Sequence, residues 1–556
     1  MIQSLETEEL VFIPLGGAGE IGMNLNLYGY GHKDNKDWII VDLGVTFSKG
    51  DLPGVEVILP DPLFIEQHRK RLLGIVLTHA HEDHIGAVQY LWPKLKCPIF
   101  ATSFTLSVLR RKLAETNFAE KVKIIEVPLA GNFNIGPFKM ELITLTHSIP
   151  EPNAIAITTP AGTVMHTGDW KFDPDPIVGP VADEDTLRHF GDSGILAMVC
   201  DSTNVFSQGS SGSESDIYDN LSKLVTGYKG RVAVACFASN IARLQTIAAV
   251  AKENSRKVVL AGRSLRRITN AARENGYLAE TPAFLDEEEA GSIPGDKVLI
   301  ICTGSQGEPR AALARIANND HSRIKLEAGD RVIFSSRIIP GNESAINQLQ
   351  NNLIKLGIDV VTAEDILIHV SGHPARDEIT QMYHYVRPQI AVPVHGEFKH
   401  LQEHAKIAKN CQVPYTQVIE NGMVMRLAPG HPTIVDHVPS GRLVVDGNRI
   451  IPIDGEVLRS RTRTMWNGFA VITLIMKGID LNGEIEISTT GLVEDDNDPS
   501  LCQVRLAVKK ALSKLQSTQL RDDKFVSEEA RVTARRTLHS TLGKRPVVRI
   551  HLVRID

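Results

Sequence analysis

In the first 200 residues, short apolar runs alternate with clusters of polar residues. Five of these runs end in a cluster that contains histidine or aspartate: 38–44 (WIIVDLG), 74–80 (GIVLTHA), 140–148 (MELITLTHS), 163–169 (TVMHTGD) and 195–203 (ILAMVCDST). Layered α/β folds build their sites from buried strands that present polar groups at the carboxyl end. The pattern therefore predicts strands whose carboxyl ends contribute to a common site.

A Ser/Gly stretch at 207–215 (SQGSSGSES) marks a boundary, and beyond it apolar runs alternate with helical segments. The four run-and-helix pairs begin at residues 231, 256, 297 and 330. This alternation predicts a doubly wound parallel sheet. The earlier pattern returns at 366–374 (ILIHVSGHP) and 389–397 (QIAVPVHGE), so an inserted domain interrupts the first one.

In the remainder of the chain, the pattern of apolar and polar residues predicts short strands and turns up to about residue 455, followed by a small α+β domain. That last domain has apolar runs typical of strands at 469–476 and 546–555, and helical patterns at 501–515 and 527–543. We expect domain segments at 1–210, 211–360 and 361–455, a linker at 456–464, and a final domain at 465–556.

Composition excludes several classes of protein. The chain has 556 residues, of which 42% are apolar and 23% charged, and a net charge of −6. No apolar run is long enough to span a bilayer, and the first residues are acidic where a signal peptide is basic, so we expect a cytoplasmic protein. The six cysteines are scattered without a C-x-x-C pair, which argues against a disulfide framework or a thiolate zinc site.

The segment 77–87 (LTHAHEDHIGA) contains a dense cluster of histidine and carboxylate side chains. His79, His81, Asp83 and His84 lie where a predicted strand gives way to a helix. Neutral imidazole and carboxylate are ligands that zinc accepts. A solvated polar loop explains a single histidine but not this density, so the segment predicts a metal site.

Further ligands are expected from the ends of other apolar runs: His147, Asp169, His373 and His395. Each alone is equally compatible with a hydrogen-bonded core histidine or a turn aspartate. Together they exceed what one tetrahedral ion needs. Two ions about 3.5–4 Å apart, sharing a carboxylate and a hydroxide, fit this number of ligands better.

These residues carry a resemblance to a known family. The H-x-H-x-D-H motif, followed by His147 and Asp169, resembles the metallo-β-lactamase signature, and the insertion before the last two histidines resembles the beta-CASP branch. Four further motifs resemble bacterial ribonuclease J: PLGGAGEIGMN (14–24), TGSQGEP (303–309), SSRIIPGNE (335–343) and HVSGHPARDE (369–378). The resemblance implies an α/β fold: a metallo-β-lactamase αββα sandwich from 1–210 and 361–455, a beta-CASP α/β domain at 211–360, and a C-terminal α+β domain at 465–556.

The resemblance also implies roles for individual residues. One zinc ion would be held by His79, His81 and His147, the other by Asp83, His84 and His395, with Asp169 as the bridge. Asp83, Asp169 and His373 are the implied catalytic residues, and His373 would contact the scissile phosphate. The implied substrate-binding residues are Ala238, Ser239, Asn240, Ser335, Ser336, Arg337, His369, Val370, Ser371, Gly372 and His373. Gly54 and Glu56 are a weaker match to a structural calcium site, and Pro374 and Arg376 depart from the family pattern.

The implied activity is that of a zinc-dependent ribonuclease in RNA maturation and mRNA decay. It would degrade RNA from 5′-monophosphate ends and also cut internally, as a homodimer or homotetramer assembled through the C-terminal domain. Two alternatives keep the fold: a beta-CASP nuclease acting on DNA, and a small-molecule hydrolase such as a lactonase. A small substrate would not require an insertion of roughly 150 residues. A third alternative, a non-catalytic scaffold, is at odds with the complete ligand set.

Overall fold

The computed structural model describes residues 8–33, 35–48, 50–495 and 497–556. The chain forms two compact units: the described residues up to Phe47 together with Val57–Leu443, and Ser48–Glu56 together with Val444–Asp556. Within the described ranges, every helix is too short or too polar to cross a bilayer.

Two large sheets form the core of the first unit. The first has the strand order β24-β23-β1-β3-β4-β7-β8-β9, and the second the order β10-β11-β12-β13-β14-β20-β22. The strands of the first sheet are β1 (Glu9–Gly16), β3 (Leu25–His32), β4 (Asn35–Leu43), β7 (Leu72–Val76), β8 (Ile99–Ala101), β9 (Ile124–Glu126), β23 (Met423–Ala428) and β24 (Thr433–His437). Those of the second are β10 (Asn132–Ile135), β11 (Phe138–Thr144), β12 (Asn153–Thr159), β13 (Gly162–His166), β14 (Ala197–Asp201), β20 (Ile390–Val394) and β22 (Tyr415–Thr416).

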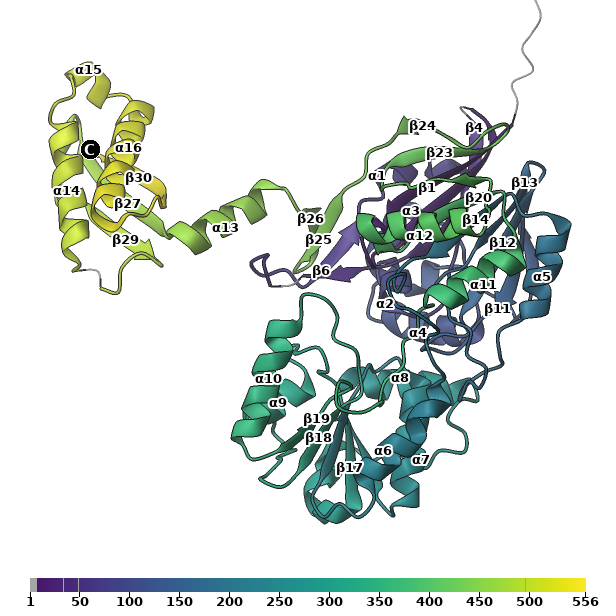
Figure 1. Ribbon diagram of the computed structural model, residues 1–556. Coiled ribbons are helices and arrows are strands. Elements are labelled where there is room, and N and C mark those ends of the chain that lie inside the picture. Colours follow the sequence, from purple (N-terminus) through teal and green to yellow (C-terminus); the bar gives the residue numbers. More distant parts are fainter. Residues whose placement is uncertain (1–7, 34, 49, 496) are drawn as a thin grey trace, which may run out of the picture. The chain divides into compact units, whose positions relative to one another are not determined.

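The two sheets pack face to face. One cluster of buried apolar side chains joins Phe12 and Val41 of the first sheet to Phe138 and Val392 of the second. A second cluster covers the other face of the second sheet, to which helices contribute Leu187, Met382 and Ile407. These helices are α5 (Glu184–Ser193), α11 (Arg376–Val386) and α12 (Phe398–Asn410), all labelled in Figure 1.

Helical crossovers connect the parallel strands β7, β8 and β9 of the first sheet. The helices that precede and form these crossovers are α1 (Leu63–Gln67), α2 (Glu82–Ile85), α3 (Val88–Leu95) and α4 (Ser103–Leu113). The buried side chains of α3 and α4 are absent from the cluster between the sheets, so these helices cover the outer face. This arrangement confirms the predicted αββα sandwich.

The inserted domain separates two strands that are neighbours in space. β14 and β20 pair in parallel from Ala197↔Ile390 to Asp201↔Val394, although nearly 190 residues lie between them in sequence. We call residues 202–213 the outgoing segment and residues 362–375 the return segment. These two segments connect the sandwich to the insertion.

The inserted domain is a parallel sheet covered by helices on both faces (Figure 1). Its strand order is β16-β17-β15-β18-β19. The strands are β15 (Val232–Ala235), β16 (Lys257–Ala261), β17 (Val298–Cys302), β18 (Arg331–Phe334) and β19 (Asp359–Val361). The helices are α6 (Tyr218–Val225), α7 (Ile241–Glu253), α8 (Arg263–Glu274), α9 (Ala312–Ala317) and α10 (Glu343–Lys355). The alternation of strands and helices expected from the sequence is confirmed.

The second unit has its own apolar core. β27 (Phe469–Lys477) pairs with β29 (Glu486–Thr490) and, in parallel, with β30 (Val547–Ile555). Every second residue of β27 is buried, from Ala470 to Met476. Ala470, Ile472 and Leu474 pack in one cluster with the apolar faces of α14 (Pro499–Leu512) and α16 (Asp523–Leu542). The remaining elements of this unit include α13 (Glu456–Asn467), α15 (Ser517–Leu520), β26 (Arg449–Pro452) and β28 (Asp480–Leu481).

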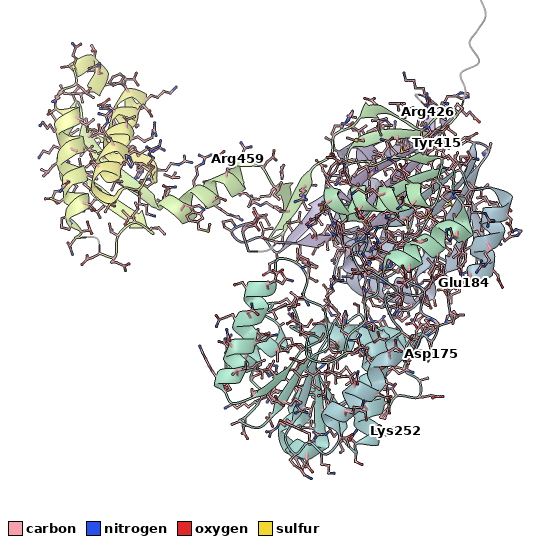
Figure 2. The ribbon with its side chains drawn as sticks, in the orientation of Figure 1. Asp175, Glu184, Lys252, Tyr415, Arg426 and Arg459 are labelled. Atoms are coloured by element: carbon pink, nitrogen blue, oxygen red, sulfur yellow. The ribbon has the colours of Figure 1, made fainter. Side chains whose placement is uncertain are left out.

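Two segments differ from the expectation. The apolar run 366–374 was expected to behave like the other strands, but the return segment that contains it has no helix or strand. Side chains rather than a neighbouring strand bind the Ile368 carbonyl, as described below. The segment 456–464, expected as a linker, forms most of helix α13, and Arg459 on this helix is labelled in Figure 2.

Candidate metal centre and substrate pocket

The carboxyl ends of several strands meet at one edge of the sandwich. β11, β13, β14 and β20 run in the same direction, so their carboxyl ends lie together. His147, Asp169, Asp201 and His395 lie at or just beyond these four ends. From the other sheet, β7 leads into His79. The polar clusters that follow the apolar runs are thereby brought to one place.

Four side chains form a first group of potential metal ligands: His79, His81, His147 and Asp169. His81 Nδ1 lies 3.1 Å from His79 Nε2 and 3.0 Å from His147 Nε2. Asp169 Oδ2 lies 3.8 Å from His79 Nε2 and 3.9 Å from His147 Nε2. Three ring nitrogens and one carboxylate oxygen thus face a common point.

A second group shares Asp169 with the first: Asp83, His84, Asp169 and His395. Asp169 Oδ2 lies 3.1 Å from His84 Nε2, and Asp169 Oδ1 lies 3.0 Å from His395 Nδ1. Asp83 Oδ2 is 3.6 Å from His84 Nε2 and 3.2 Å from His395 Nε2. The carboxylate of Asp169 therefore lies between the two groups.

Hydrogen bonds outside the groups fix which ring nitrogens carry lone pairs. His147 Nδ1 donates to the Gly372 carbonyl, and His84 Nδ1 donates to Asp42 Oδ2 at 2.7 Å. His79 Nδ1 donates to Thr78 Oγ1 at 2.9 Å, because that hydroxyl donates its own proton to Asp42. In the neutral form of each ring, the Nε2 atom then carries a lone pair that points into the groups.

The donor set fits a divalent cation. Lone pairs and carboxylate oxygens that face one another repel unless a cation or extra protons compensate them. Among the described residues, Asp169 Oδ1 is a buried carboxylate oxygen without a hydrogen-bond partner, although His395 Nδ1 lies close to it. Nitrogen and oxygen donors in this combination match the ligands of zinc.

The pKa values of the histidines in the two groups also indicate a cation site. Burial lowers the pKa of His81 to about 4, and burial and the neighbouring imidazoles hold the pKa values of His79 and His147 well below 6.5. These rings are therefore neutral, as metal ligands must be. In the second group burial is outweighed by charge: Asp169 above all raises the pKa values of His84 and His395. Protons on these two rings therefore supply positive charge that a bound cation would supply in their place.

Asp42 is a functional residue that the sequence prediction left out. It is fully buried at the end of β4, and its carboxylate accepts from Thr78 N at 2.8 Å, Thr78 Oγ1 at 2.9 Å and His84 Nδ1 at 2.7 Å. A carboxylate behind a metal-binding histidine fixes the ring's tautomer and orientation. The signal was present, because Asp42 ends the apolar run 38–44 as the predicted ligands end theirs.

Unusual backbone conformations occur at the same residues. Asp42 has a φ of +63° and His395 a φ of +53°, a region that residues other than glycine adopt rarely. His395 is held there by its N–H, which donates to the Gly17 carbonyl at 2.6 Å. Gly44 permits a close approach of the ligand loop, because a Cβ there would lie 1.7 Å from the Asp83 carbonyl oxygen.

His373 and Asp201 form a pair beside the two groups. His373 Nδ1 lies 2.8 Å from Asp201 Oδ2 and 3.9 Å from Asp169 Oδ2. Asp201 is fixed in turn, because its Oδ1 accepts from Thr203 N at 2.8 Å and from Thr203 Oγ1 at 2.7 Å. The predicted catalytic His373 therefore lies at the metal centre, with Nε2 as the ring nitrogen not engaged by Asp201. Asp201 lies near the end of the apolar run 195–203 but was not predicted as a site residue.

Asn204 joins two of the predicted substrate-binding segments. Its Oδ1 accepts from Arg337 Nη1 at 2.6 Å, and its Nδ2 donates to Ser371 Oγ at 2.6 Å and to the His373 carbonyl at 3.1 Å. Ser371 Oγ also accepts from His373 N at 3.1 Å. With both of its lone pairs used, the Ser371 hydroxyl is left as a donor. The sequence analysis gave no role to Asn204.

The other predicted substrate-binding residues differ in exposure. Ser335 is 1% exposed, and its hydroxyl donates to the Ile368 carbonyl. Asn240 is also buried and caps helix α7 by accepting from Arg243 N at 2.9 Å. Arg337 is exposed, while Ala238, Ser239, His369, Ser371, Gly372 and His373 are partly buried and Ser336 and Val370 are buried. Ser335 and Asn240 are thus placed to support neighbouring residues, not to reach a ligand with their polar atoms.

Arg376, Gly54 and Glu56 were also singled out from the sequence. Arg376, which departs from the family pattern, donates to Glu403 Oε1 at 2.8 Å on helix α12. Gly54 and Glu56 of the predicted calcium site lie in the second unit, where a Cβ on Gly54 would be 3.6 Å from Arg461 Nη1. Among the described residues, Glu56 belongs to none of the groups suited to a metal ion. The calcium site stays a prediction.

The fold and its ligand groups define a metallo-β-lactamase-type metallohydrolase with a beta-CASP insertion. Models of known families match the chain in four segments: the metallo-beta-lactamase superfamily at residues 30–210, the beta-CASP domain of ribonuclease J at 229–353, a Zn-dependent metallo-hydrolase RNA specificity domain at 357–414, and the ribonuclease J C-terminal domain at 456–555. The chain belongs to the ribonuclease J family.

Relatives match over nearly the whole chain. Ribonuclease J of Sinorhizobium meliloti is 42% identical over 99% of this chain and 98% of its own length. Ribonuclease J of Mycolicibacterium smegmatis is 38% identical over 96% of this chain and 95% of its own. A solved structure of a protein of unknown function from Enterococcus faecalis V583 aligns with a TM-score of 0.52 at 15% identity, covering 75% of this chain and all of that one. That likeness concerns the fold alone.

Proposed function

We propose that this chain, a metal-dependent RNA hydrolase of the ribonuclease J family, holds two zinc ions and degrades RNA from 5′-monophosphate ends, with additional internal cutting. The observation that carries the proposal is the pair of ligand groups that share Asp169, with His373 beside them. His79, His81 and His147 would hold one ion, and Asp83, His84 and His395 the other. The domain boundaries predicted in the sequence analysis are part of the same proposal.

Two ions held by these groups would supply a hydroxide at neutral pH and offset the charge that builds on the phosphate. The protein's own residues then have separable tasks. Asp42 holds the orientation of His84 and, through Thr78, of His79. Asp201 holds His373 through Nδ1, so that Nε2 can meet the scissile phosphate or the leaving oxygen. Asp83 can orient the nucleophile in addition to binding metal.

The preference for a 5′-monophosphate rests on the donors near this centre. Ser371 offers a hydroxyl proton, and Arg337 offers a guanidinium that Asn204 holds in place through Nη1. Within the described ranges the Ser336 hydroxyl makes no hydrogen bond, so it is a further candidate donor. Hydroxyl and guanidinium donors suit one terminal phosphate. A triphosphate would bring added charge into a pocket without partners for it.

We also propose that the second unit assembles the enzyme into a homodimer or homotetramer. This unit presents exposed apolar side chains, with Trp466 66% and Leu506 63% exposed. None of the proposed ligands or pocket residues belongs to it. Sedimentation equilibrium of the full chain tests the proposal, and a monomer at micromolar concentration contradicts it.

The activity is tested with one RNA sequence in three forms: with a 5′-monophosphate, with a 5′-triphosphate and as a circle without ends. We expect mononucleotides to appear first from the monophosphate form, slower release from the triphosphate form, and slow fragmentation of the circle. Elemental analysis of the same preparation is expected to find about two zinc ions per chain. Equal mononucleotide release from both linear forms contradicts the end preference, and full activity in strong chelator contradicts the metal centre.

A further inference from the structure

Arg243 contacts both segments that connect the sandwich to the inserted domain. It lies in the first turn of α7 and is fully buried, while Lys252, labelled in Figure 2, marks the other end of this helix. On the outgoing side, Arg243 Nε lies 2.6 Å from Glu214 Oε1 and Nη2 lies 3.1 Å from Glu214 Oε2. This is a buried bidentate pair with the residue that directly follows the outgoing segment.

On the return side, the same guanidinium binds main-chain and side-chain acceptors. Arg243 Nη1 donates to Ser335, whose carbonyl oxygen lies at 2.8 Å and whose Oγ lies at 2.7 Å, and the Ile368 carbonyl oxygen lies 3.2 Å from the same nitrogen. His369 Nδ1 lies 3.4 Å from the same nitrogen. Ser335 Oγ in turn donates to the Ile368 carbonyl at 2.6 Å. One nitrogen thus binds the end of β18 and the return segment together.

Glu214 is itself anchored to the sandwich. Its N–H donates to Asp173 Oδ2 at 2.9 Å. Ser213 Oγ donates to Asp173 Oδ1 at 2.6 Å and lies 3.0 Å from the carbonyl oxygen of Asp175, which is labelled in Figure 2. Lys171 Nζ lies 2.8 Å from Asp173 Oδ2. The contacts therefore run from the sandwich through Glu214 and Arg243 to the return segment.

The positions held in this way belong to the proposed end-binding pocket. Ser335 directly precedes Ser336 and Arg337, and Ile368 directly precedes 369–373. The return segment has no strand or helix of its own, so side-chain contacts must fix it. Resting on the function proposed above, we infer that Arg243 is a positioning residue for the 5′-end pocket. It sets the spacing between the Ser336–Arg337 donors and the Ser371 donor without touching RNA.

The test uses Arg243→Lys in the full chain. Lysine keeps a positive charge beside Glu214 but has a single nitrogen, which cannot serve both Glu214 and the acceptors on the return side. A double variant, Arg243→Met with Glu214→Met, removes both buried charges and serves if the lysine variant does not fold. The matched control is Arg331→Lys: Arg331 lies at the opposite end of β18, pairs with Asp359 at 2.6 Å, and also donates to a carbonyl.

Three quantities are measured for wild type and variants: kcat and KM for mononucleotide release from 5′-monophosphate RNA, the same for RNA with a 5′-hydroxyl, and the cutting rate of circular RNA. For Arg243→Lys we expect KM for the monophosphate form to rise about tenfold, with loss of the preference over the hydroxyl form. Circle cutting and metal content should stay within about twofold of wild type, because the ligand groups do not depend on Arg243. Arg331→Lys should change none of these.

The outcomes separate the inference from the function on which it rests. A wild-type enzyme without end preference overturns the proposed function, and the role of Arg243 with it. A wild-type preference that Arg243→Lys, or the double variant in its place, leaves intact overturns the role of Arg243 alone. Equal losses of end-directed cleavage, circle cutting and metal in these variants also overturn it, since Arg243 would then support the whole fold.

Discussion

The two ligand groups and the return segment beside them are held in place by different means. His147, Asp169 and His395 lie at or just beyond the ends of paired strands, and His81, Asp83 and His84 lie at the start of the short helix α2 that follows β7, so the positions of the ligands follow from secondary structure. The return segment lacks secondary structure, and Arg243, Ser335 and Asn204 bind its carbonyls or side chains. A strand end tolerates the loss of one side chain better than a segment fixed by a few hydrogen bonds. We therefore expect substitutions in the first region to affect chemistry and those in the second to affect the choice of substrate.

The largest effect is expected from removing a metal ligand. His81→Ala takes away the nitrogen that lies within 3.1 Å of both His79 Nε2 and His147 Nε2. We expect hydrolysis of linear and circular RNA to fall together by more than about 100-fold, beyond the effect typical of partners outside the ligand shell. The unfolding temperature should change little, because His81 directly precedes helix α2, its side chain makes no capping hydrogen bond there, and it is not part of the apolar core. Near-normal turnover would show that His81 is not a ligand.

The second-largest effect is expected from replacing Asp42, which contacts the ligand His84 from outside the two groups. Asp42→Asn keeps the shape of the side chain but weakens its hold on His84 Nδ1 and Thr78. We expect a loss of about 10–100-fold in zinc affinity or activity, as for other carboxylates behind metal-binding histidines. Asp37→Asn is the matched control: it lies on the same strand, and its partner Arg71 is on the surface. An unchanged zinc affinity in Asp42→Asn would remove this carboxylate from the centre.

A smaller and more selective effect is expected in the return segment. Asn204→Ala frees Arg337 Nη1, Ser371 Oγ and the His373 carbonyl at once. We expect KM for 5′-monophosphate RNA to rise about tenfold while circular RNA is cut at nearly the wild-type rate. Asn352→Ala, which removes an exposed hydrogen bond to Asn318, is the control. A parallel loss on both substrates would mean that Asn204 serves the metal centre instead of the pocket.

The same contrast, between residues positioned by secondary structure and a segment held by side chains, explains what could be predicted from the sequence. The runs 38–44, 163–169 and 389–397 each contain a strand, because apolar runs that end in polar residues are a local pattern. The residues predicted as ligands consequently fall into groups that share Asp169. The run 366–374 shows the same pattern but forms no strand, because its carbonyl partners are side chains from distant parts of the chain. The roles of Asp42, Asn204 and Arg243 depend on contacts of this kind, which spacing along the sequence does not reveal.

The smallest effect on the rate of hydrolysis is expected from removing the C-terminal region, which contributes no residue to the metal centre or to the end-binding pocket. Residues 465–556 form a separate sheet-and-helix core, in which Ile472, Val504 and Ala530 pack together. Because this core shares no side chain with the clusters of the sandwich, its removal should leave metal content and the rate of circle cutting within about twofold of the full chain. The sedimentation coefficient should instead fall to that of a monomer, since exposed Trp466 and Leu506 are lost with it. The His81→Ala variant in the full chain is the counterpart, expected to assemble normally and not to cleave. Loss of zinc on truncation would contradict the separation, because it would make the metal centre depend on a region that contains none of its ligands.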